Sequence, residues 1–120
     1  MPQSQNVLVA SIFLAMNIEF KKIIIAGADH TWHQNLHLDE QNILYIKDIH
    51  FYNNEEKINY RPFNKGLHIN ETFKIHEIFA LWAKAFYGYI ALEDYAKYKS
   101  CKIYNASEVT FIDAFERLKL

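Results

Sequence analysis

Residues 21–33 read Lys-Lys-Ile-Ile-Ile-Ala-Gly-Ala-Asp-His-Thr-Trp-His, and they are the strongest indication of the fold in the chain. Its short, uninterrupted β-branched run is typical of a strand that is buried on both faces of a parallel sheet. The predicted strand, residues 22–27, opens directly onto polar side chains. In open α/β sheets, ligands bind in the crevice outside the carboxyl ends of the strands. We therefore expect a ligand site at this end of the strand, formed by Gly27, Asp29, His30 and Trp32.

The composition is that of a folded protein of one domain. The chain has 120 residues, of which 51% are hydrophobic and 22% are charged, and such a length is typical of a single domain. The formal net charge of -1 argues against nucleic acid as a partner, since nucleic-acid binding depends on a basic surface. No run approaches the roughly 18 apolar residues of a membrane span, and the single cysteine, Cys101, favours a reducing compartment. The sequence thus predicts a cytoplasmic protein without a transmembrane segment.

A helix is predicted before the strand. Residues 7–16 are apolar with Ser11 as the interruption, and several of them are good helix formers. Ser4 is the predicted N-cap, and Asn17 or Glu19 is predicted to end the helix. Because apolar side chains surround its axis, we expect this helix to be covered on most sides.

The middle of the chain, from residue 28 to about residue 66, is irregular and polar. Residues 43–46 and 50–52 are predicted as short strands, with a turn at Asn53-Asn54 between polar residues. Residues 61–66 are predicted as a loop, because they contain a proline near one end and a glycine at the other. We interpret this region as an excursion from the sheet, irregular or a β-hairpin, that covers the crevice.

A long helix is predicted after the excursion. Asn70 is its predicted cap, and Glu71 is placed in its first turn. Apolar and aromatic side chains then recur at three- and four-residue steps as far as Leu92. Gly88 is predicted to bend this helix, which would then consist of two pieces.

The predicted order of elements is that of a partial Rossmann-like α/β sheet flanked by helices. Residues 101–105 are predicted as a second buried strand, and Ser107 or Thr110 as the cap of a last short helix through Phe115. Two parallel strands make a thin sheet, and the three glycines stand too far apart for a phosphate-binding loop. We therefore interpret residues 1–120 as a single α/β domain that is the C-terminal part of a larger Rossmann-like domain. The alternative is a chain that pairs with its own copies or with another chain.

Two segments resemble a known pair of families. Residues 17–29, Asn-Ile-Glu-Phe-Lys-Lys-Ile-Ile-Ile-Ala-Gly-Ala-Asp, follow an apolar helix, and residues 102–107 read Lys-Ile-Tyr-Asn-Ala-Ser, with Phe-Ile-Asp at 111–113. The first segment resembles a hydrophobic strand that ends in Gly-x-Asp, and the second a closing strand with a Tyr-Asn-x-Ser/Thr turn. Both features occur in the bacterial sialyltransferases of glycosyltransferase family 42. They also occur in the related flagellin-modification accessory and 6-hydroxymethylpterin-diphosphokinase-like family.

The resemblance implies sugar transfer in the synthesis of surface glycans, from a nucleotide-sugar donor, typically CMP-sialic acid, to a glycan acceptor. It implies no essential metal and no other cofactor. A histidine after the Gly-x-Asp strand is the general base of that family, and His68 is the nearest candidate by order along the chain, with His50 and His76 as rivals. Asp29 is the second catalytic candidate, because a carboxylate there can hold a ribose or sugar hydroxyl. The substrate-binding candidates are then Gly27, His30, Trp32, Asn105 and Ser107.

Two other interpretations stay open. His30, His33 and His37 would share one face if their segment were helical, and imidazoles bind zinc and similar ions, so this set is the alternative metal site. The second alternative is a non-catalytic interaction or oligomerisation module that uses the broad aromatic face of the long helix. Its partner would be a second copy of the chain or an upstream domain.

Overall fold

The computed structural model describes residues 6–52 and 55–120, which form two compact units. Unit 1 comprises the chain up to His30 together with Ala80–Leu120, and unit 2 comprises Thr31–Phe79. Within the described ranges, no helix combines the length and the apolar character that a membrane crossing requires.

Unit 1 is built on a parallel sheet of three strands in the order β1-β7-β8. The strands are β1 (Lys22–Ile25), β7 (Lys102–Asn105) and β8 (Glu116–Arg117). In their register, Ile23 lies opposite Ile103, and Asn105 lies opposite Arg117. The predicted α/β fold with a partial parallel sheet is therefore confirmed.

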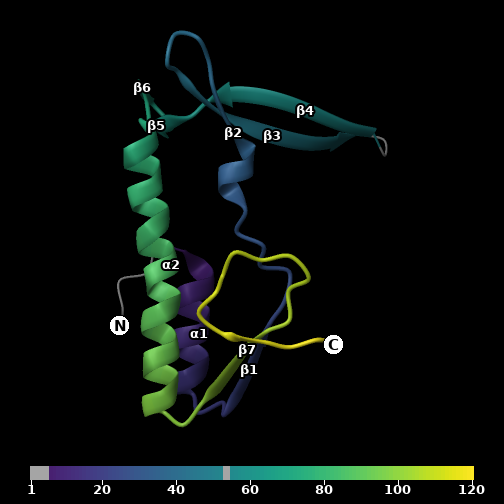
Figure 1. Cartoon of the computed structure of the whole chain (residues 1–120), viewed down its shortest axis with the longest axis vertical. Helices are drawn as coiled ribbons and strands as arrows, with labels where there is room; N and C mark the ends of the chain where they lie inside the picture. Colours follow the sequence, from purple (N-terminus) through teal and green to yellow (C-terminus); the bar gives the residue numbers. More distant parts are fainter. Residues whose placement is uncertain (1–5, 53–54) are drawn as a thin grey trace. The chain divides into compact units, whose positions relative to one another are not determined.

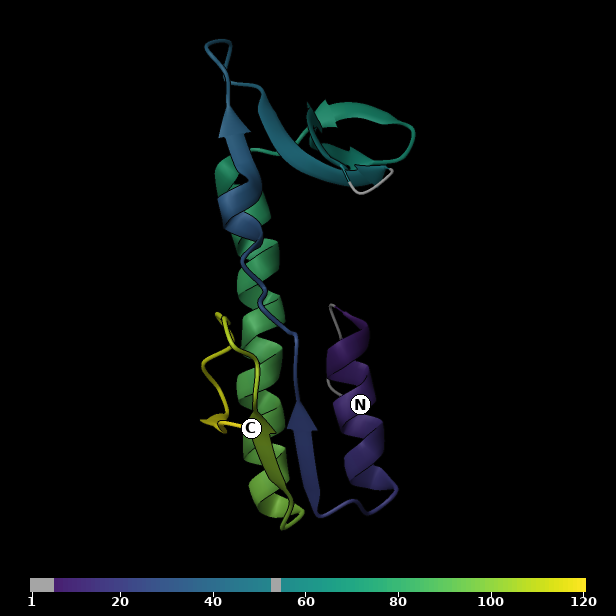
Figure 2. The same cartoon turned by 90° about the vertical axis from the view of Figure 1, so that its right-hand side faces the viewer.

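The two helices pack on the same face of this sheet (Figure 1, Figure 2). They are α1 (Val7–Asn17) and α2 (Ile75–Tyr98), of which α2 belongs to unit 1 from Ala80 onward. The core between sheet and helices draws apolar side chains from each of these elements. Its largest fully buried side chains are Val9, Met16, Tyr89, Leu92, Ile103 and Ile112.

The opposite face of the sheet is open within unit 1. Side chains alternate between the two faces of a strand, and Ile24 is 44% exposed whereas Ile25 is buried. On the same face as Ile24, the ammonium groups of Lys22 and Lys102 each lie 5.6 Å from the centre of the Tyr104 ring. The expectation that the first strand is buried on both faces is therefore wrong, because both helices cover the same side.

The ends of α1 are defined by local hydrogen bonds. Asn6 is the N-cap, and its Oδ1 accepts a hydrogen bond from the N–H of Val9 at 3.0 Å. The predicted cap, Ser4, lies outside the described residues. The helix ends at Asn17, as predicted, and Glu19 follows with a left-handed φ of 73°.

One side of α1 is not covered. Val9, Ile12 and Met16 are buried on the side that faces the sheet and α2, whereas Val7 and Leu14, on the opposite side, are exposed. The expectation that this helix is covered on most sides is therefore wrong for the described chain. The reason is that its packing partners in unit 1 all contact one side.

α2 is one continuous helix of 24 residues, so the predicted start at Asn70 and the predicted division at Gly88 are both wrong. Asn70 lies in a strand, β6 (Ile69–Thr72). Gly88 is buried against α1, where a Cβ atom would lie 3.5 Å from Cγ2 of Val9. The glycine thus marks a close approach of the two helices and does not mark a bend.

Replacing Gly88 with alanine is expected to stabilise unit 1 by about 0.5–1 kcal/mol. The added Cβ would make ordinary contacts with Val9, at 3.5 and 3.7 Å, and alanine avoids the conformational cost of glycine in a helix. Denaturant unfolding of the two proteins measures the difference. The matched control is Gly27→Ala, which is expected to destabilise because Gly27 has a φ of +69°. A lower unfolding midpoint for Gly88→Ala than for the parent chain would contradict the described contact.

Residues 106–115 contain no helix, so the predicted last helix is wrong. The hydroxyl of Thr110 donates to the carbonyl of Ala28 at 2.6 Å, and the Oγ of Ser107 accepts from the N–H of Ala28 at 3.0 Å. The two predicted caps therefore bind the loop after β1 and leave no cap for a helix. The segment continues into β8, a strand that the sequence does not predict.

Unit 2 is the excursion after β1, and it is confirmed as antiparallel (Figure 1). One sheet has the strand order β2-β3-β4, and a second pairs β5 with β6. The elements before α2 are η1 (Trp32–Asn35), β2 (Leu36–Leu38), β3 (Leu44–Tyr52), β4 (Glu55–Pro62), β5 (Asn64–Gly66) and β6. Whether this excursion covers the crevice stays a prediction.

The predicted details of the excursion need correction. The two short strands expected over residues 43–46 and 50–52 are one strand, β3, and the loop expected over residues 61–66 is divided between β4 and β5. Pro62 is tolerated in β4 because it ends a strand at the edge of its sheet. The turn expected at Asn53-Asn54 lies outside the described residues.

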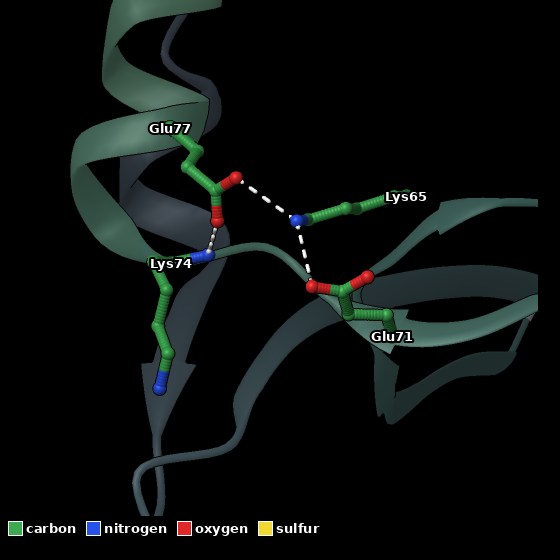
Figure 3. A network of polar contacts seen from close by, with 4 residues as sticks. All are labelled: Lys65, Glu71, Lys74 and Glu77. Carbon is green, nitrogen blue, oxygen red and sulfur yellow. Dashed lines mark hydrogen bonds and ion pairs between the residues drawn. The ribbon is translucent and has the colours of Figure 1, made fainter.

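The start of α2 is fixed by polar contacts within unit 2 (Figure 3). Oε1 of Glu77 accepts a hydrogen bond from the backbone N–H of Lys74 at 2.9 Å, which is one half of a capping box. The ammonium of Lys65 lies 2.9 Å from Oε2 of Glu77 and 3.0 Å from Oε1 of Glu71. The hydrogen bond from Lys74, and then the contact with Lys65, lower the pKa of Glu77. The carboxylate of Glu77 therefore determines where the helix begins.

Candidate functional site

The carboxyl ends of β1, β7 and β8 lie at one edge of the sheet, which we call the carboxyl edge. It is formed by the residues that follow each strand, 26–30, 106–110 and 118–120. This is the edge at which open α/β sheets bind their ligands. All of these residues belong to unit 1.

A hydrogen-bond network around Asn105 joins the loops after β1 and β7. Asn105 is fully buried, and its Oδ1 accepts from the N–H of Ser107 at 3.0 Å. Its Nδ2 donates to Oγ1 of Thr110 at 3.2 Å and to the carbonyl of Ile112 at 3.3 Å. Ser107 and Thr110 in turn hold both backbone polar groups of Ala28. Asn105 is therefore buried beneath the carboxyl edge, and its hydrogen bonds hold the loops of this edge in place.

A cleft of about 550 Å³ opens beside this network. Nη2 of Arg117 donates to the carbonyls of Ser107 and Glu108, at 2.6 and 3.4 Å, which holds the guanidinium at the cleft. Lys119 adds a second cation. The complete lining is Ala106, Ser107, Glu108, Arg117, Leu118, Lys119 and Leu120. Arg117 and Lys119 outnumber Glu108, the acidic side chain of this lining, and this excess of positive charge suits an anionic group such as a phosphate.

Gly27 and Asp29 lie on the loop that follows β1 at the same edge. Gly27 has a φ of 69°, a conformation that favours glycine. The carbonyl of Asp29 accepts a hydrogen bond from the N–H of Phe111 at 2.8 Å, while its side chain is exposed. The backbone of this loop is thus fixed, and the carboxylate is accessible to a ligand.

His30 turns back toward the core of unit 1. It has a φ of 53°, and its Nε2 lies 2.6 Å from the hydroxyl of Tyr89, which donates to Oδ1 of Asn6 at 3.3 Å. A tyrosine hydroxyl has a single hydrogen. Because the Tyr89 hydroxyl donates this hydrogen to Asn6, it can only accept from His30, so Nε2 of His30 carries a proton and is the donor. Burial lowers the pKa of His30 below its ordinary value of 6.5, and the smaller effect of Asp29 raises it. The imidazole is therefore neutral at pH 7.

The lowered pKa of His30 predicts that unit 1 loses stability as the pH falls from 7 to 5. The unfolded chain binds a proton at this histidine more readily than the folded chain does, so acid favours unfolding. The contribution is fully present above pH 6.5 and is lost as the pH falls through the folded pKa. Urea unfolding at several pH values measures it. His30→Asn, which tolerates a positive φ, should show a flatter dependence; an identical slope in both proteins would contradict the assignment to His30.

The remaining predicted residues lie in unit 2. Trp32 and His33 are in η1, and His37 is in β2. His68 is exposed in the turn between β5 and β6. Of its rivals, His76 lies in the first turn of α2, and the side chain of His50 lies outside the described ones.

The histidines of the alternative metal site are assigned to different units. His30 belongs to unit 1, whereas His33 and His37 belong to unit 2. In the described part of the chain, no three His, Cys, Asp or Glu side chains form a group that could hold a metal ion.

Sequence reasoning missed Arg117 and Lys119, the two cations of the cleft. Their signal in the sequence is weak: residues 115–120 read Phe-Glu-Arg-Leu-Lys-Leu, and only the last four alternate between charged and apolar side chains. Such alternation is typical of a strand. Parallel pairing of β8 with β7, which is a long-range contact, brings these cations to the carboxyl edge.

No protein-family model, curated protein or solved structure matches this chain. The resemblance to the sialyltransferases therefore depends on the two sequence segments that carry it.

Proposed function

We propose that this chain is a glycosyltransferase-like unit, similar to the bacterial sialyltransferases, that binds a nucleotide sugar at its carboxyl edge. The observation that carries the proposal is the cleft beside Ser107, which contains Arg117 and Lys119 and lies where parallel sheets bind ligands. A nucleotide sugar combines an anionic phosphate with several hydroxyl groups. The cations of the cleft and the exposed carboxylate of Asp29 offer complementary groups for both.

Each residue of the carboxyl edge has a proposed role. Arg117 and Lys119 hold the phosphate, because a guanidinium or an ammonium pairs favourably with a phosphate oxygen. Asp29 accepts hydrogen bonds from ribose or sugar hydroxyls. Gly27 allows the ligand to approach the backbone, since it has no side chain. Asn105 positions the loops and is not expected to contact the ligand, because its polar atoms are already bonded within the chain.

His68 is the proposed general base that deprotonates the acceptor hydroxyl, since a neutral imidazole has a ring nitrogen that can accept a proton. Replacing it with alanine is expected to lower sugar transfer from CMP-sialic acid by about 100-fold or more and to leave donor binding unchanged. His76→Ala, which replaces a rival candidate, is the control. Turnover that is unchanged in His68→Ala and lost in His76→Ala would assign the base to His76.

Calorimetric titration of the chain with CMP in the presence of EDTA tests the proposal, with UMP and AMP as comparisons. Saturable binding that prefers CMP is expected. Lys119→Gln should weaken CMP binding by about tenfold, the equivalent of roughly 1.4 kcal/mol. Lys84→Gln, which removes an exposed lysine of α2 far along the chain from the cleft, should change nothing. Absence of CMP binding, or CMP binding that Lys119→Gln does not weaken, would contradict the proposal.

The second candidate function is an assembly module that uses the aromatic face of α2. Tyr87, Ile90 and Tyr98 are exposed on this helix, and aromatic side chains are enriched in protein interfaces. Light scattering at micromolar concentrations tests this function. A dimer that Tyr87→Asp converts to monomers would support it, and a monomer in the parent chain would count against it.

A further inference from the structure

One face of the antiparallel sheet in unit 2 carries polar and aromatic side chains. In the strand register, His37 lies opposite Tyr45, and Tyr45 lies opposite Pro62. Tyr60 stands two residues before Pro62, and side chains two residues apart share a face of the sheet. His37, Tyr45 and Tyr60 are therefore neighbours on one face, while Leu44, the buried residue of β3, points to the other.

These side chains line a pocket of about 430 Å³ together with Asp39. The rings of His37 and Tyr60 are in contact, with 5.7 Å between their centres and an angle of 56° between their planes. Oδ1 of Asp39 accepts hydrogen bonds from the N–H groups of Gln41 and Ile43, at 2.9 and 2.8 Å. The carboxylate is thus held in place at the pocket by the turn that joins β2 to β3.

The tyrosines of this pocket are not fully used in packing the protein core. Tyr60 is 54% exposed, so most of the benefit of burying its ring is not obtained within the chain. In the described part of the chain, no group forms a hydrogen bond with the hydroxyl of Tyr45 or Tyr60. The pocket therefore presents two aromatic rings and several hydrogen-bonding groups to solvent.

We propose that this pocket binds a neutral pyranose ring of a glycan. The apolar C–H face of a pyranose can lie against the face of an aromatic ring, and its hydroxyls can donate to a carboxylate and exchange hydrogen bonds with imidazole and phenol groups. The lining contains one carboxylate, that of Asp39, and no lysine or arginine, so it favours a neutral sugar over an anionic one. The volume lies within the range of roughly 300–1,000 Å³ that is usual for ligand pockets.

The role of the bound sugar depends on the proposed function, whereas the sugar site itself does not. If the chain transfers sugars, this site holds the acceptor glycan, and the sugar unit of the glycan that it recognises is neutral. The site belongs to unit 2 alone, and its four lining residues are all described.

Saturation-transfer NMR of the whole chain with methyl glycosides of glucose, galactose and N-acetylglucosamine tests the inference, with sialic acid as the anionic comparison. At least one neutral glycoside should bind at millimolar concentration. Tyr60→Ala should weaken its binding by about tenfold, and Tyr60→Phe, which keeps the ring, should weaken it less. Phe20→Ala, which removes an exposed aromatic ring of unit 1, is the control and should have no effect. Circular dichroism verifies that each variant is folded.

The possible results separate this inference from the proposed function. The inference is overturned if none of the neutral glycosides binds, if sialic acid binds equally well, or if Tyr60→Ala and Phe20→Ala have the same effect. A chain that binds a glycoside at Tyr60 but does not bind CMP supports the sugar site and contradicts the nucleotide-sugar proposal. A chain that binds CMP but no glycoside supports the nucleotide-sugar proposal and contradicts the sugar site.

Discussion

Replacing Asn105 with leucine is expected to lower the free energy of unfolding by about 3–5 kcal/mol. Leucine has a similar volume, but it leaves the N–H of Ser107 and the carbonyl of Ile112 without their partner in a buried environment. It also removes the hydrogen bond from Nδ2 to the hydroxyl of Thr110. Each unsatisfied buried group costs roughly 1–3 kcal/mol. Urea unfolding followed by circular dichroism measures the loss.

Asn105→Asp is the matched control for this prediction. A carboxylate can still accept from the N–H of Ser107, but it cannot donate to the carbonyl of Ile112. Because position 105 is fully buried, the ionised carboxylate would be an unpaired buried charge, so at pH 7 a loss at least as large as that of leucine is expected. Part of it should be recovered at acidic pH, where the protonated acid regains a donor. If leucine and aspartate variants were both as stable as the parent, the network around Asn105 would not hold the carboxyl edge.

Replacing Ile103 with alanine is expected to lower the free energy of unfolding by about 2–5 kcal/mol. Ile103 is fully buried in the central strand of the parallel sheet, in the core that both helices cover. Loss of three methyl or methylene groups there removes burial and leaves a cavity that the neighbouring elements cannot fill completely. Hydrogen exchange of the amides of β1 and β7 should become faster by the factor that corresponds to the lost free energy of unfolding.

Ile24→Ala is the matched control for Ile103→Ala. Ile24 lies on the neighbouring strand, but it points to the open face of the sheet and is 44% exposed. Its replacement should cost less than about 1 kcal/mol. A loss at Ile24 as large as the loss at Ile103 would indicate that the open face is covered in solution, and it would contradict the description of that face.

The parts of the fold that could be predicted are those whose signals are local. The isoleucine run of β1 and the charge-free, helix-forming sequence of α1 each determine their own conformation. The start of α2 could not be located by its obvious cap, because Asn70 pairs in a hairpin and the carboxylate of Glu77 provides the cap instead. In this case, tertiary pairing prevailed over a local preference.

The candidate site was predictable to a similar extent. The rule that ligands bind at the carboxyl ends of parallel strands led to Gly27 and Asp29, which lie at the carboxyl edge but outside the lining of the cleft; their role in binding stays a prediction. Arg117 could not be found in this way, because it reaches the edge through the pairing of a strand of two residues. Asn105 and Ser107 were chosen as substrate-binding candidates, and the structure places Ser107 in the lining of the cleft while Asn105 is fully buried.

Amide chemical shifts of the ¹⁵N-labelled chain, recorded while CMP is added, test whether a nucleotide binds at the carboxyl edge. We expect shifts that saturate and that cluster at the carboxyl edge, at residues 27–30, 106–108 and 117–120. Amides at the opposite ends of the strands, near Lys22 and Lys102, should not move. Absence of saturable shifts, or saturable shifts confined to residues outside the carboxyl edge, would contradict the claim that a nucleotide sugar binds there.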